Sequence, residues 1–209
     1  MKTHKEKQIY LIKKAVAEYG TENNVIAIPG FLSKSFIAYC SMREDILLSL
    51  QYVKHLKTIP TDAVIRSALN YTLVSSYGKC FTDARKSKSP KLEPSKIFEN
   101  HKYFIETHEF IMMLRHEFIA HRGKTDSEAA IAFMVFPVGR PDENAQIKYK
   151  QLKEVSFNED RILQFEKLLN FIITVLENKI EKCSNKIYKS LFKLFTEEEI
   201  SAMTMNGIK

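Results

Sequence analysis

The apolar positions recur at helical intervals along most of the chain, so the sequence predicts a mainly helical protein. Local end signals divide this pattern into segments. Thr3 and Glu6 have the spacing of a capping box, and Asp62 is a candidate N-cap for a later helix. Thr196 and Glu199 repeat the capping-box spacing before a short final helix. The longer helices are expected at residues 3–19, 43–57, 62–81, 95–121 and 158–194.

The region before the last long helix has a different pattern. Residues 130–137 (AIAFMVFP) are apolar up to Pro137, and residues 145–151 (AQIKYKQ) alternate in polarity. The turn-rich string VGRPDEN lies between them, so a β-hairpin is predicted at about residues 130–152. Because the sequence contains neither a repeat nor a second compositional block, we expect one domain over residues 1–209, an all-α bundle with a small appended hairpin.

Composition narrows the class of protein. With 44% hydrophobic and 27% charged residues the chain is typical of a globular protein. Its 32 basic residues exceed its 25 acidic ones, a net charge of +7 that favours a polyanionic partner such as nucleic acid. No apolar run approaches the roughly 20 residues of a membrane span, and the N-terminus lacks the pattern of a signal peptide. Three cysteines without metal-type spacing predict a reduced, cytoplasmic protein.

The segment RHEFIAHRG, residues 115–123, contains the candidate chemistry. It superficially resembles a zinc-protease motif, which needs two histidines four positions apart on one helical face. Here His116 and His121 are five apart, about 140° around a helix, so that interpretation is rejected. His101 and His108, seven apart, are too far separated to share one ion. We therefore expect neither a metal nor a cofactor.

The charged residues of this segment have structural alternatives as well. Arg115 lies close to the apolar face of its predicted helix, where an unpaired charge is costly, so a salt bridge to a glutamate on another helix is one explanation. His121, at the predicted helix end, could serve only to complement the helix dipole. Arg122 and Lys124 could be ordinary solvated charges.

Taken together, however, these residues resemble the signature of HEPN proteins. In that signature an Arg precedes a polar residue, and a His follows after four to six intervening positions. Here His116 follows Arg115, and five residues separate Arg115 from His121. The upstream string YGKCFTDARKSK and the helix leading to LRHEFIAHRG are similar to the branch associated with abortive infection. The resemblance covers roughly residues 43–180 and implies a HEPN-like antiparallel helical bundle that cleaves RNA as a phage-defence effector or toxin.

RNA supplies its own nucleophile, the 2′-hydroxyl, so a metal-free site needs proton transfer and stabilisation of phosphorane charge. Histidine suits the first task and arginine the second. We therefore expect His121 to transfer protons, Arg115 to bind the phosphate, and His116 to orient the site or contact RNA. Arg122 and Lys124 would add phosphate contacts. The products would be a 2′,3′-cyclic phosphate and a 5′-hydroxyl.

Helix geometry constrains such a site. Arg115 and His121 are about 120° apart around an ideal helix and about 9 Å apart along it, which is poor for convergence on one phosphate. A distortion of the helix end, or a second copy of the motif in a symmetric dimer, would remove the difficulty. The family's composite dimer sites point the same way, so the expected partners are RNA and a second copy of the chain. An antitoxin or regulatory protein is a further expected partner.

Two other functions remain open at the level of sequence. The first is a non-catalytic HEPN scaffold or RNA-binding regulatory module, because not all members of that family cut RNA. The second is a plain helical bundle whose basic surface is incidental.

Overall fold

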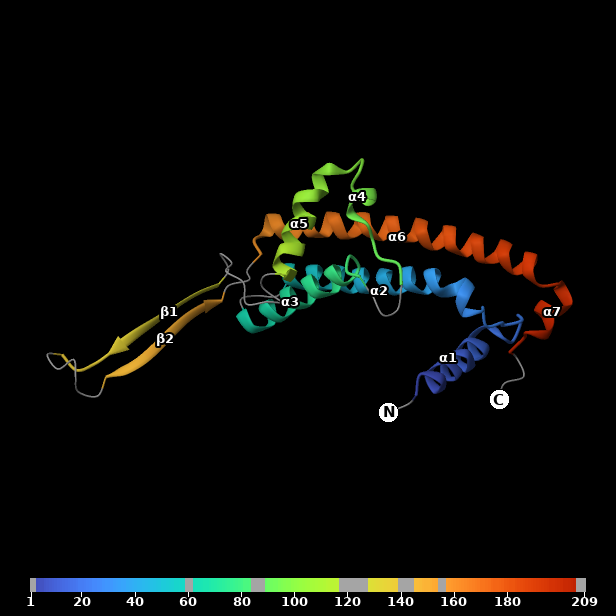
Figure 1. Cartoon of the computed structure of the whole chain (residues 1–209), viewed down its shortest axis with the longest axis horizontal. Coiled ribbons are helices and arrows are strands. Elements are labelled where there is room, and N and C mark those ends of the chain that lie inside the picture. The colour runs from blue at the N-terminus through green and yellow to red at the C-terminus, as the bar shows by residue number, and fades with distance from the viewer. Residues whose placement is uncertain are drawn as a thin grey trace. The chain divides into compact units, whose positions relative to one another are not determined.

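The computed structural model describes residues 3–58, 62–83, 89–116, 128–138, 145–153 and 157–205 of the chain. Most of these residues are helical, and the described sheet is a single antiparallel pair of strands (Figure 1). The prediction of a mainly helical protein with a small β-hairpin is therefore confirmed at this coarse level. Among the described residues, no helix combines the length and apolar character needed to cross a membrane.

The chain divides into two compact units, and the long helices α2 (Gly30–Thr58) and α6 (Glu159–Leu194) contribute residues to both. The first unit comprises Met1–Cys40 and Asn178–Lys209. It contains α1 (His4–Tyr19) and α7 (Glu197–Ala202), each begun by the predicted capping box. The Met205 N–H donates to the Val25 carbonyl at 2.7 Å, so the segment after α7 pairs with the segment after α1.

The second unit, Ser41–Glu177, contains the larger part of the buried core. Here the apolar stripes of α2, α3 (Ala63–Lys79), α5 (Ile105–Met113) and α6 are buried. Lys57 and Glu166 form an ion pair between α2 and α6. The side chains with no exposed surface include Ile46, Val53, Leu73, Leu92, Ile111, Phe165, Leu168, Leu169, Ile172 and Leu176.

Two predicted helices have different bounds in the structure. The helix expected at residues 43–57 begins at Gly30, because no breaking residue follows Pro29 until the end of α2. The helix expected at residues 95–121 was wrong in its first half. The structure instead has a short α4 (Pro94–Ile97), a 3₁₀ turn η1 (Lys102–Phe104) and then α5. Ile97 and Phe98 are buried at the break, so tertiary packing takes precedence over the helical periodicity there.

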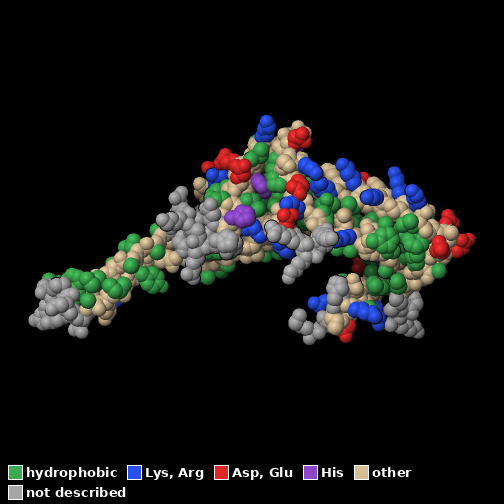
Figure 2. Space-filling view, in the orientation of Figure 1, with side chains coloured by type: hydrophobic (Ala, Val, Ile, Leu, Met, Phe, Trp, Pro, Cys, Tyr) green, Lys and Arg blue, Asp and Glu red, His purple; other side chains and the backbone are tan. Residues whose placement is uncertain are grey.

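The hairpin consists of β1 (Glu128–Val135) and β2 (Gln146–Lys153), close to the predicted residues 130–152. The strands pair in antiparallel register, with Ala132 opposite Tyr149. Its large apolar side chains remain exposed: Ile131 is 65%, Ile147 76% and Tyr149 74% exposed. Figure 2 shows hydrophobic atoms along the surface of this arm.

Candidate functional site

Arg115 lies at the contact between α5 and the C-terminal turn of α3. Its side chain crosses Gly78, a buried residue of α3. A Cβ at position 78 would overlap Arg115 Cδ and lie 2.7 Å from Nε and 3.1 Å from Cγ. Glycine is thus the residue that permits this close approach, and the stem of Arg115 is confined by the backbone of α3.

The backbone at Arg115 is not regular α-helix. α5 ends at Met113, and residues 114–116 continue it as one wider, π-helical turn. Such turns inside or at the ends of helices are frequent at functional sites. The regular helix from which the 120° separation was projected is therefore absent at residues 114–116.

Arg115 is half-buried, yet its guanidinium has no ion-pair partner among the carboxylates that the structure describes. The structural salt bridge considered from the sequence is thus not found within those residues. His116, next along the turn, is exposed. A confined cation without a described anion beside an exposed imidazole is an arrangement that can receive an anionic ligand.

A buried polar pair joins the same two helices, and its α3 member, Tyr77, directly precedes Gly78. The Tyr77 hydroxyl of α3 and His108 Nδ1 of α5 lie 2.8 Å apart, and both side chains are buried. The His108 ring also packs against Phe81 and Phe98, with centroid distances of 4.5 and 5.0 Å. Burial lowers the pKa of His108 to about 4 and raises the pKa of Tyr77 well above its ordinary value. His108 is therefore neutral near pH 7 and serves to position α5 on α3, since proton transfer at that pH requires a pKa near it.

In the sequence, His108 is a candidate only for metal binding, and the role of positioning α5 on α3 was not predicted. Its position in the sequence could have indicated a buried, structural residue. His108 lies seven residues before Arg115, about two helical turns, and three residues before buried Ile111. The residue also borders a surface cavity of about 350 Å³ between α4 and α5.

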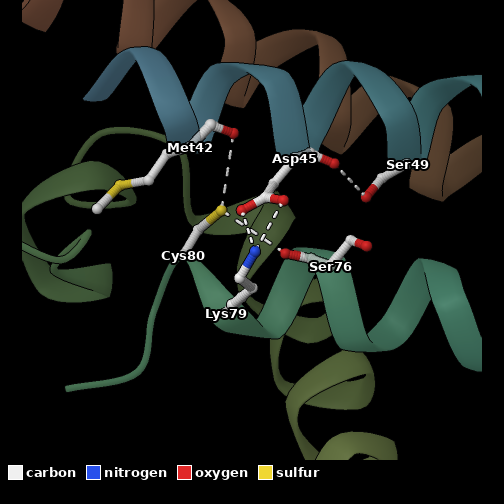
Figure 3. Close-up of polar contacts among 6 residues, drawn as sticks. All are labelled: Met42, Asp45, Ser49, Ser76, Lys79 and Cys80. Atoms are coloured by element: carbon white, nitrogen blue, oxygen red, sulfur yellow. Dashed lines mark hydrogen bonds and ion pairs between the residues drawn. The ribbon is translucent and has the colours of Figure 1, made fainter. Parts of the chain in front are cut away.

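A second set of contacts holds the C-terminal end of α3 to α2 (Figure 3). Lys79 Nζ lies 3.0 and 2.9 Å from the two carboxylate oxygens of Asp45. The Cys80 thiol approaches the Met42 carbonyl at 3.8 Å and the Ser76 carbonyl at 3.7 Å. Burial, aided by Asp45, raises the pKa of Cys80 to about 12, so this thiol stays protonated and is a structural group rather than a nucleophile.

The other residues predicted for the site lie outside the described residues. They are His121, Arg122 and Lys124. The structure thus locates Arg115 and His116 of the predicted set. It adds Gly78, which the Arg115 side chain crosses, and the Tyr77–His108 pair, which joins α3 to α5. Across the described ranges, the His, Cys, Asp and Glu side chains form no group of three that could hold a metal ion.

Comparison of the chain with protein-family models, curated proteins and solved structures found no match.

Proposed function

We propose that this chain is a metal-independent endoribonuclease with a HEPN-like helical bundle, acting as a toxin or phage-defence effector. The observation that carries the proposal is Arg115, a half-buried cation confined over Gly78 without a described carboxylate partner. A phosphate fits this position because the planar guanidinium can donate two parallel hydrogen bonds to its oxygens.

In the proposed reaction the 2′-hydroxyl attacks the adjacent phosphorus as it loses its proton, and the bond to the 5′ oxygen breaks as that oxygen gains one. His121 transfers the protons, and Arg115 stabilises the charge that develops on the phosphorane. His116 orients the site or contacts RNA, while Arg122 and Lys124 add phosphate contacts. The products are a 2′,3′-cyclic phosphate and a 5′-hydroxyl, so the reaction needs no cofactor.

The proposed active form is a homodimer in which each chain contributes part of the site. An antitoxin or regulatory protein would restrain it in the cell. We place the activity in the cytoplasm, and the thiols of Cys80 and Cys183, neither of which forms a disulfide, support a reducing compartment.

The test of catalysis is incubation of the purified chain with mixed RNA in EDTA, beside Arg115→Ala and His121→Ala. Cleavage by the unsubstituted chain alone, with cyclic-phosphate ends, is expected. RNA that stays intact across varied sequences and dimer concentrations would overturn the proposal and favour a non-catalytic scaffold.

The composite site has its own test. The two inactive variants are mixed and allowed to exchange subunits. If each site takes Arg115 from one chain and His121 from the other, half of the heterodimer's sites are intact and about a quarter of the activity returns. No recovery, or a strict monomer by solution mass, would contradict a shared site.

A further inference from the structure

The C-terminal half of α6 is strongly basic on one side. Between residues 178 and 194 the chain has five lysines and one glutamate, so this stretch supplies over half of the net charge of +7. Four of the lysines, Lys182, Lys186, Lys189 and Lys193, are spaced by four, three and four positions. At about 100° per residue they all fall within about 60° of one another around the helix. Figure 2 shows Lys and Arg side chains gathered along this part of α6.

These four lysines line one surface groove. It has a volume of about 380 Å³, and Asn185 and Ser190 contribute its other polar groups. All four side chains are exposed, and none of them pairs with a carboxylate in the part of the chain that the structure describes. The positive charge of the groove is therefore not neutralised by the protein within that part.

Two exposed aromatic rings flank the lysines on one side. Tyr188 is 65% exposed and Phe192 48% exposed, with ring centroids 4.8 Å apart. Around the helix they lie about 80° to 120° from Lys182, beyond Asn185. A row of cations beside exposed rings is the combination that binds single-stranded nucleic acid, in which phosphates meet the charges and unpaired bases stack on the rings.

The dimensions agree with such a ligand. From Lys182 to Lys193 the helix rises about 16.5 Å. Stacked nucleotides advance about 3.4 Å each along one strand, so the row of lysines spans about five phosphates. This lies within the roughly 4 to 16 nucleotides that single-strand sites occupy.

An anionic membrane surface is the competing ligand, since basic helices with aromatic residues also bind there. A membrane-surface helix, however, buries its apolar face in lipid. On α6 the apolar face opposite the lysines contains Ile187 and Leu191, which are only 8% and 7% exposed. Because the protein itself covers that face, the geometry favours nucleic acid.

We propose that Lys182, Lys186, Lys189 and Lys193, with Tyr188 and Phe192, form a binding surface for single-stranded RNA, hereafter the α6 surface. It is distinct from Arg115, which contacts the scissile phosphate in the proposed nuclease. The α6 surface binds the strand by its charge and unpaired bases, whether or not that strand is cut.

The test uses a fluorescent 20-nucleotide 2′-O-methyl oligouridylate, which lacks the attacking hydroxyl and so cannot be cleaved. Affinity is measured by anisotropy between 50 and 200 mM salt. Each phosphate contact contributes about 0.7 to the slope of log affinity against log salt for a single strand. The variant K182Q/K186Q/K189Q/K193Q should lower the magnitude of this slope by about three. The matched variant K5Q/K7Q/K13Q/K14Q, with the same charge change at exposed positions of α1, should leave it unchanged.

The aromatic contribution is tested separately. The variant Tyr188→Ala/Phe192→Ala should weaken binding at least about tenfold while leaving the salt slope intact. The control Tyr103→Ala/Tyr149→Ala removes two comparably exposed rings and should bind normally. Thermal unfolding of every variant checks that the fold is retained.

Equal binding by the two quadruple variants overturns the proposal, as does absence of binding by the unsubstituted chain. Stronger binding to a duplex of the same length, unaffected by loss of the rings, would overturn the single-strand preference. Capture by phosphatidylglycerol vesicles instead of the oligonucleotide, lost in K182Q/K186Q/K189Q/K193Q, would assign the surface to membranes. Since the probe cannot be cut, these outcomes are independent of whether the chain is a nuclease.

Discussion

Arg115 and the lysines of the α6 surface present the same charge to a phosphate in opposite ways. Arg115 is half-buried, and its stem is confined over Gly78. The four lysines are exposed on flexible stems along one helix face. A confined fork fixes the position of one phosphate, whereas a row of mobile point charges attracts many phosphates without fixing any. The first arrangement suits chemistry and the second suits capture, so substitutions should affect them differently.

The largest expected effect is at Arg115 itself. Arg115→Ala should reduce single-turnover RNA cleavage by about a thousandfold, the magnitude typical of losing a transition-state donor. Arg115→Lys should be nearly as poor, because an ammonium on a flexible stem does not reproduce the two parallel hydrogen bonds. Lys186→Arg, the converse change on the α6 surface, should cleave normally. Near-normal cleavage by Arg115→Lys would show that only the positive charge matters at Arg115, as it does at the lysines of the α6 surface.

A smaller effect is expected from Gly78→Ala, which tests the confinement directly. The new Cβ would overlap Arg115 Cδ and displace the side chain, so cleavage should fall about 10- to 100-fold. The free energy of unfolding should change by less than about 1 kcal/mol. The preference for alanine over glycine inside a helix is of similar size and offsets the cost of displacing the Arg115 side chain. Gly30→Ala is the matched control, since a Cβ there meets nothing within 4 Å. Unchanged cleavage in Gly78→Ala would remove the basis for the comparison.

The buried contact between His108 of α5 and Tyr77 of α3 should be sensitive to acid. The pKa of His108 is about 4 in the folded chain, below the ordinary value of 6.5. Folding therefore favours the neutral form of His108. The free energy of unfolding is highest above pH 6.5, where this group costs nothing, and it falls as the pH decreases from 6.5 towards 4. Chemical denaturation should show that the free energy of unfolding falls by about 1 to 3 kcal/mol over that range. His108→Gln should lack this component, and His55→Gln, at an exposed position, should retain it. An unchanged pH profile in His108→Gln would contradict this assignment.

Single lysines of the α6 surface should have the smallest effects. Lys186→Gln is expected to weaken binding of the uncleavable oligonucleotide two- to fivefold and to lower the salt slope by about 0.7. Cleavage at saturating RNA should be unaffected. Lys13→Gln, at an exposed position of α1, serves as the control. A loss of affinity as large as that of K182Q/K186Q/K189Q/K193Q would indicate that Lys186 makes one dominant contact, rather than that the four lysines share the binding.

Helices with local end signals could be predicted from the sequence. Thr3, Asp62 and Thr196 each cap the helix expected from them, because a cap involves neighbouring residues only. The interruption between α4 and α5 could not be predicted, because it depends on the burial of Ile97 and Phe98 by distant elements.

The candidate site was predictable to the same extent. The spacing of RHEFIAHRG identified Arg115 and His116. Gly78, which the Arg115 side chain crosses, lies 37 positions earlier, and Tyr77 lies 31 positions before its partner His108, so neither contact could be found from a local pattern. The lysine spacing on α6 was visible in the sequence. The net charge of the whole chain does not reveal this cluster of lysines, since basic and acidic residues are more evenly balanced in the rest of the chain.

The β-hairpin has a consequence for the chain in concentrated solution. From Ala129 to Val135, β1 has seven uncharged residues without proline, and its exposed apolar side chains have no covering layer in the described part of the chain. Such a segment favours strand addition and fibril-like stacking. On β2, Lys148 and Lys150 alternate with apolar residues, and they oppose a second hairpin by like-charge repulsion. The colloidal stability of the protein should therefore depend on two side chains in an arm that contributes little to its core.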